Sequence, residues 1–333
     1  MRITRETLLK LAHDTALERV RLNRRIVCVY LTGSLLHEEP LLGGAGDIDL
    51  FVIHDSQPTA EREVIRMSDE IHLDIAHLSQ DMFRQPRLLR THPWISPFIT
   101  AHPVVYHDVQ HWFEFAQAAI TSQFSEPTNV LTRARQLSEA ARLAWLEANA
   151  AAAATPPMVW KFLKALEHAG NAIATLTGSP LTERRFLLEF AQRTVALGRP
   201  ELSAAMLELF APLPVEEDDW KAWQTAWQQA FHSASQQANC PPRLAPVRFN
   251  YYQRAAQALH EQNPAAALWI CLRSWSEAVA ALPAGDPSAA AWQNALPALA
   301  LAEGEFHARL EALDAYLDQV EETLDEYARQ TGA

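Results

Sequence analysis

The chain has 333 residues, of which 49% are apolar and only 10 are glycine. This size and composition argue against disorder, and they leave room for two or three mainly helical domains with large cores. The formal net charge of −12 argues against a general nucleic-acid binder, because phosphate neutralisation needs clustered Lys and Arg, although a local basic pocket stays open.

The cysteines and the N-terminal segment indicate a cytoplasmic protein. Cys28, Cys240 and Cys271 lie far apart in the sequence and show no CxxC spacing, so we expect reduced, buried thiols. The segment Met1–Glu6 has no apolar signal core, and no stretch approaches the roughly 20 apolar residues of a membrane span. We therefore expect no membrane partner, while the oligomeric state stays open.

The first part of the chain is predicted to alternate helix and strand. Apolar residues at helical spacing predict a helix over residues 5–23, and a continuous β-branched run predicts a buried strand over residues 26–31. A glycine-rich turn at residues 43–46 leads to a second strand, and residues 61–68 are expected to form a short exposed helix. This second strand is expected over residues 47–54, a third over 71–78, and an edge strand over 104–106.

The rest of the chain is predicted to be helical almost to its end. Four prolines between residues 86 and 103 should keep the helices there short. Longer helices are expected over residues 131–154, 158–176, 181–197, 201–210 and 220–237, and again within 250–329, with the acidic helix 309–329 last. Pro212–Pro214 should interrupt two of these helices.

The fold class that follows is α+β. We predict a small mixed-sheet catalytic domain over residues 1–115, a helical bundle over 116–238 that closes its cleft, and a C-terminal helical domain over 239–333. The second boundary is placed where prolines cluster, at residues 241–246, because proline interrupts helices and is common in linkers.

Two aspartates open the second predicted strand. Side chains in a strand alternate between faces, so Asp47 and Asp49 should point the same way and repel unless a cation lies between them. Carboxylates of this kind suit Mg²⁺, which usually binds one or two of them together with substrate phosphates. Asp74 is a third acid in a neighbouring predicted strand, on the face that carries His72 and is opposite to Ile71.

A Gly-Ser turn precedes the two aspartates. Gly33 lets a backbone approach a phosphate closely, and Ser34 can donate a hydrogen bond to it. Farther along, Lys161 and Lys164 share one face of the predicted helix 158–176. That face is either solvated or reaches a triphosphate held by the first domain, and the sequence leaves both interpretations open.

Gly33-Ser34, then Asp47-x-Asp49, then the isolated strand residue Asp74, resembles the nucleotidyltransferase superfamily of the polymerase-β type. The chain looks most like bacterial stand-alone enzymes related to aminoglycoside nucleotidyltransferases, over about the first 110 residues. The twelve-residue loop between Ser34 and Asp47 is somewhat longer than in the small members of that superfamily.

The resemblance implies transfer of a nucleotidyl group, with pyrophosphate leaving. Two Mg²⁺ ions would be held by Asp47, Asp49 and Asp74, and ATP or another NTP would be the co-substrate. Asp74 would either bridge the metals or act as general base, and His72 would orient it or be an ordinary surface histidine. Gly33 and Ser34 would bind the β- and γ-phosphates, and Lys161 or Lys164 would offset the pyrophosphate charge.

Three functions remain open. The first is transfer of AMP, or another NMP, to a hydroxyl of a small molecule such as an aminoglycoside, which an acidic protein would attract. The second is modification of a macromolecule, either a protein side chain or an RNA or tRNA end, as in toxin–antitoxin systems. The third is a nucleotide-binding module without catalysis. Arg254 and His260 also have a spacing found in some helical ribonucleases, although this spacing is common on any helix.

Overall fold

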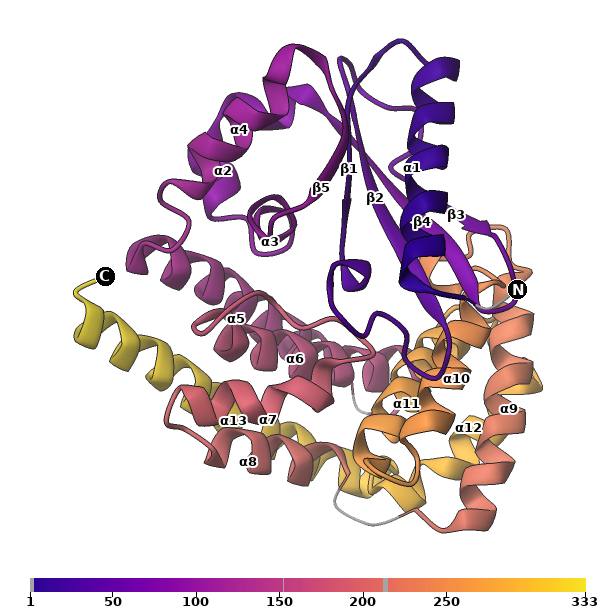
Figure 1. The fold of residues 1–333 in the computed structure, drawn as a ribbon. Helices are drawn as coiled ribbons and strands as arrows, with labels where there is room; N and C mark the ends of the chain where they lie inside the picture. The colour runs from indigo at the N-terminus through magenta and orange to yellow at the C-terminus, as the bar shows by residue number, and fades with distance from the viewer. Residues whose placement is uncertain (1–2, 152, 212–214) are drawn as a thin grey trace. The chain divides into compact units, whose positions relative to one another are not determined.

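The chain forms two compact units, Met1–Asn129 and Val130–Ala333 (Figure 1). The computed structural model describes residues 3–151, 153–211 and 215–333, so the predicted interruption at Pro212–Pro214 lies outside the described residues. Unit 1 combines a sheet with helices and unit 2 is helical, which confirms the predicted α+β class. Among the described residues, every helix is too short or too polar to cross a bilayer.

Unit 1 is built on a five-stranded mixed sheet with the order β3–β4–β2–β1–β5. Within it β2 and β4 run parallel, and the other neighbouring strands are antiparallel. The strands are β1 (Ile26–Thr32), β2 (Gly46–His54), β3 (Arg62–Arg66), β4 (Ile71–Ser79) and β5 (Val104–Asp108). The predictions of β1, β2 and β4, and of β5 at an edge, are confirmed.

The short helix expected over residues 61–68 is wrong, because these residues form β3 at the other edge of the sheet. β3 pairs with β4 in antiparallel register, from Arg62 opposite Ala76 to Arg66 opposite His72. The charged residues suggested an exposed helix, but β4 offers a row of backbone donors and acceptors that an adjacent strand satisfies. The β-branched Val64 and Ile65 also favour a strand.

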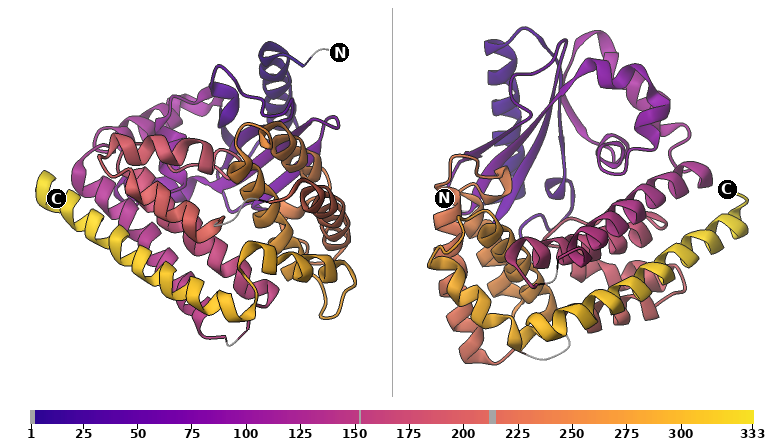
Figure 2. Two further views of the ribbon diagram at one scale, coloured as in Figure 1. Left: turned by 90° about the horizontal axis from the view of Figure 1, so that it is seen from below. Right: turned by 180° about the vertical axis from the view of Figure 1, so that it is seen from behind.

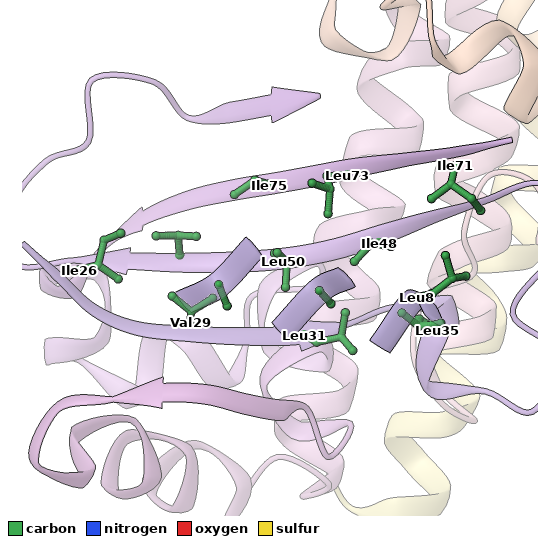
Figure 3. Packing of buried hydrophobic residues seen from close by; sticks show 13 residues of the cluster. Leu8, Ile26, Val29, Leu31, Leu35, Ile48, Leu50, Ile71, Leu73 and Ile75 are labelled. Atoms are coloured by element: carbon green, nitrogen blue, oxygen red, sulfur yellow. The ribbon is translucent and has the colours of Figure 1, made fainter. Parts of the chain in front are cut away.

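Helices cover both faces of this sheet (Figures 1 and 2). α1 (Arg5–Leu22) packs on one face, and α2 (Pro86–Arg90), α3 (Ile95–Thr100) and α4 (Trp112–Thr121) lie on the other. Figure 3 shows apolar side chains of the sheet and of α1 packed together, among them Leu8, Ile48, Leu50, Leu73 and Ile75.

The alternation of side chains along β2 and β4 decides where the acids point. Ile48 on β2 and Leu73 on β4 belong to the core under α1, as the sequence predicted for β4. The residues between them therefore point to the opposite face, which carries a second core of aromatic side chains. In that core Tyr30 stacks on Phe51 and Phe113, with ring centroids 5.1 and 4.6 Å apart.

Unit 2 consists of nine α-helices in its described part, with α11 at the centre. Its helices are α5 (Pro127–Asn149), α6 (Pro156–Thr175), α7 (Phe186–Ala196), α8 (Glu201–Phe210), α9 (Glu217–Ser235), α10 (Arg248–Leu259), α11 (Pro264–Ala280), α12 (Ser288–Ala295) and α13 (Glu303–Thr331). α11 packs against α6, α9 and α10, so helices on both sides of the predicted boundary at residue 238 share one unit. Pro242 begins a 3₁₀ turn near the predicted boundary.

Two features of the helical unit follow from its sequence. Trp220, Trp223 and Trp227 recur at helical spacing on α9 and are buried, and Trp220 stacks on His260 at 4.5 Å. The long acidic helix α13 runs beside α5, where Arg142 forms ion pairs with three of its carboxylates (Figure 2).

Candidate metal centre

Parallel pairing of β2 with β4 brings three predicted site residues together. Asp47 lies opposite His72 and Asp49 lies opposite Asp74 in the strand register. One ligand atom each of Asp47, His72 and Asp74 can be chosen so that all three lie within 4.8 Å of one another. This group could hold a metal ion, since carboxylate and imidazole are both ordinary ligands of divalent cations.

The burial of this group differs from that of ordinary surface polar residues. His72 and Asp74 retain 1% and 3% of their accessible surface, whereas Asp47 and Asp49 are partly buried. The alternative of a surface histidine at position 72 is therefore wrong, and Asp74 is buried as well. Buried carboxylates need a counter-charge, because desolvation penalises the ionised form strongly.

Gly33 has a conformational and a steric reason to be glycine. Its φ of 79° and ψ of −158° lie in a region essentially reserved for glycine. A Cβ at this position would lie 1.9 Å from Asp49 Oδ2, so the carboxylate occupies the space that any other residue would fill. The sequence predicted that Gly33 gives a phosphate room, whereas in the structure it gives room to Asp49.

Ser34 follows at the start of a 3₁₀ turn, Ser34–Leu36. Its Oγ is buried and has no hydrogen-bond partner among the described residues. A buried hydroxyl in this state costs free energy, and such atoms in native structures call for an explanation such as a ligand or an ordered water. The hydroxyl of Ser34, which directly follows Gly33 in the chain, could donate to such a ligand.

Arg62 is a member of the site that the sequence analysis missed. Its guanidinium donates to both oxygens of Asp74, with Nε 2.5 Å from Oδ1 and Nη2 2.6 Å from Oδ2. The missing signal was the strand itself, because a helix over residues 61–68 gives no reason to place Arg62 beside β4. A search for cations on strands adjacent to the acids would have identified it.

The donor set fits a divalent cation, with one difference from the expected ligands. The sequence predicted Asp47, Asp49 and Asp74, whereas the three groups within 4.8 Å include His72 and not Asp49. Asp49 remains next to Asp74 in the register and against Gly33. Two carboxylates with one imidazole suit Mn²⁺ and Zn²⁺ as well as Mg²⁺, which prefers oxygen ligands.

The two predicted phosphate lysines lie on α6, in unit 2, and each has a carboxylate partner there. Lys161 forms an ion pair with Glu147 of α5, and Lys164 Nζ lies 2.8 Å from Glu167 Oε2. The face they share is not simply solvated, since Asn171 on it is fully buried. Their contact with a triphosphate stays a prediction.

Lys164 belongs to a buried ionic cluster that joins α6 and α11. Arg273, 1% exposed, donates to Glu277 Oε2 at 2.5 Å and to Glu167 Oε2 at 3.3 Å. Glu183 links Arg273 to Arg243, at 3.5 and 3.3 Å. Burial alone would raise the pKa of Glu167, but the surrounding cations, Arg273 first, hold that pKa well below its usual range. Charges of both signs are matched here, which indicates a structural role.

A separate cavity of about 250 Å³ lies in unit 1 between the end of α1 and the loop 55–60. His54 and His77 line it, and their rings are joined by a 2.9 Å hydrogen bond. His77 Nε2 lies 3.0 Å from Glu63, which in turn accepts from Arg19. Burial lowers the pKa of both histidines. These side chains lie on the α1 face of the sheet, so the cavity is not part of the metal centre.

No known family model matches the chain, and no curated protein is significantly similar to it. Function is therefore inferred from the geometry of β2, β4 and the Gly33–Ser34 bend.

Proposed function

We propose that unit 1 is the catalytic domain of a nucleotidyltransferase that transfers an NMP, with AMP from ATP as the first candidate, to an acceptor hydroxyl. The observation that carries this proposal is the meeting of Asp47, Asp49 and Asp74 on one face of paired strands, beside Gly33 and Ser34. The resemblance in sequence required this meeting, and acids far apart in space would have removed its basis.

Each side chain would have a distinct role. Asp47, His72 and Asp74 would hold a divalent ion. Such an ion, when bound, supplies charge neutralisation for a triphosphate and lowers the pKa of a hydroxyl. The Ser34 hydroxyl would donate to a phosphate oxygen, since its Oγ has no partner among the described residues. Asp49, fixed against Gly33, would complete the acidic face, and Asp74 would serve as a ligand or as general base.

The acceptor class follows from charge. With a net charge of −12, the protein attracts cationic small molecules such as aminoglycosides more readily than it attracts RNA. The helices of unit 2 would supply acceptor recognition, whether the acceptor is a small molecule or, alternatively, a protein or a tRNA end. A catalytically silent module ranks last, because all three acids are present.

The test is transfer of label from four α-labelled NTPs, with Mg²⁺ or Mn²⁺, to aminoglycosides, tRNA and cell lysate. Asp47→Asn and Asp49→Asn should abolish transfer while the melting temperature stays near that of the wild type. Asp55→Asn is the matched control, since Asp55 follows β2 and is exposed. Transfer by Asp47→Asn at the wild-type rate would refute the proposal, and the labelled acceptor would decide between small molecule and macromolecule.

A further inference from the structure

We propose that Arg62 competes with a divalent ion for Asp74 at the candidate metal centre. Its guanidinium pairs with the Asp74 carboxylate and releases it when a divalent ion binds. This inference rests on the proposed function in taking Asp74 as part of the metal-binding group and a nucleotide as the second ligand of the same site. It assigns Arg62 a positioning role that links the metal to the nucleotide.

The contact between Arg62 and Asp74 is a bidentate ion pair. Nε and Nη2 of Arg62 each donate to a different oxygen of Asp74, at 2.5 and 2.6 Å. The Asp74 side chain is 2% exposed, whereas that of Arg62 is 40% exposed. Charge-assisted pairs of this geometry are the strong ones, and burial of the carboxylate strengthens them further. This guanidinium is therefore a counter-charge for the buried acid.

The position of Arg62 on β3 explains why it can reach Asp74. In the register Val64 lies opposite Asp74, and Arg62 lies one pair farther along the same face, opposite Ala76. The small side chain of Ala76 leaves the guanidinium room to turn back toward the acid. Arg66, on the same face of β3, pairs instead with Asp69 in the adjoining turn.

A metal ion and the guanidinium compete for the same carboxylate. Both need the oxygens of Asp74, and two cations beside one acid repel each other. Once displaced, the planar guanidinium of Arg62 matches phosphate oxygens, and its side chain is partly exposed, which favours contact with a ligand that enters from solvent. Metal binding without nucleotide should therefore be weak, and nucleotide should tighten it by giving Arg62 a new partner.

The experiment measures Mn²⁺ binding to the full chain by the loss of the free-ion electron paramagnetic resonance signal. Arg62→Ala should bind Mn²⁺ alone about tenfold more tightly than the wild type, which corresponds to about 1.4 kcal/mol. Arg62→Lys keeps the positive charge but loses the bidentate guanidinium, so its Mn²⁺ affinity should lie between those of the wild type and Arg62→Ala. Arg66→Ala is the matched control, since it removes one charge from the same face of β3, and it should stay within about twofold of the wild type.

A non-hydrolysable ATP analogue gives the second readout. Once the Mn²⁺ that the analogue binds by itself is subtracted, it should tighten Mn²⁺ binding in the wild type and in Arg66→Ala. The effect should be at least about fivefold smaller in Arg62→Ala, which lacks the guanidinium that would bind the phosphates. If Arg62→Ala and Arg62→Lys bind Mn²⁺ no more tightly than Arg66→Ala does, the proposed competition between Arg62 and the metal is refuted. If Asp47→Asn binds Mn²⁺ as the wild type does, the metal centre itself fails, which separates that failure from failure of the proposed competition.

Discussion

Replacing Gly33 by alanine tests the geometry on which the metal centre depends. An alanine at φ 79° and ψ −158° is strained by about 1–3 kcal/mol, because this region is essentially reserved for glycine. Its Cβ would also lie 1.9 Å from Oδ2 and 2.7 Å from Cγ of Asp49, so the carboxylate must move. We expect the free energy of unfolding of unit 1 to fall by about 2–4 kcal/mol, strain and repacking together.

A double-mutant cycle separates the two contributions. Asp49→Ala removes the carboxylate but leaves the backbone strain, so Gly33→Ala should cost about 1–2 kcal/mol less in that background. Hydrogen exchange of the β1 and β2 amides measures the unfolding free energy of unit 1 without interference from unit 2. Gly44→Ala is the control, because Gly44 also has a positive φ, 74°, but a Cβ there would meet nothing within 4 Å.

Gly33→Ala should also weaken Mn²⁺ binding, because displacement of Asp49 disturbs the group of acids around the proposed metal site. Equal destabilisation by Gly33→Ala in the wild-type and Asp49→Ala backgrounds would refute the reasoning, since the cost would then come from the backbone alone. Loss of metal binding in Gly44→Ala of the same size would point to a general softening of unit 1.

Three further predictions concern other parts of the molecule. The pKa values of His54 and His77 are lowered by burial, so protonation favours the unfolded state; the unfolding free energy of unit 1 should be full above about pH 6.5 and fall below it. In urea unfolding between pH 5 and 8, His77→Gln should flatten this slope, and an unchanged slope would contradict the assignment. Arg273→Met should cost about 3–5 kcal/mol in urea denaturation, because it removes the guanidinium that Glu167 and Glu277 share and leaves Glu167 with Lys164, and a loss below 1 kcal/mol would show that the cluster is not needed. Lys161→Ala or Lys164→Ala should weaken ATP binding in calorimetry, and identical affinity in both would leave only their ion pairs with Glu147 and Glu167.

The sequence predicted which way the acids point better than it predicted which residues they meet. Strict alternation in β4 assigned Leu73 and Asp74 to opposite faces, because the side-chain period of a strand is two. The choice of β4 as the parallel neighbour of β2 is a long-range event with no local signal. A slip of one residue in that pairing would turn Asp74 into the apolar core, so the burial of Leu73 and Ile75 fixes the register that the metal centre uses.

Arg62 illustrates what pattern analysis of one segment at a time leaves out. The charged residues around Val64 and Ile65 are compatible with an exposed helix or with an edge strand. The strand forms here because it pairs with the edge of β4. The acids themselves carried a signal for Arg62. The ionised form of a buried acid such as Asp74 is favoured by a cation nearby, so a basic residue from an adjacent segment was to be expected beside it. Among the described residues, the guanidinium found on Asp74 is that of Arg62. The counter-charge needed for folding thus lies where a metal would later compete with it.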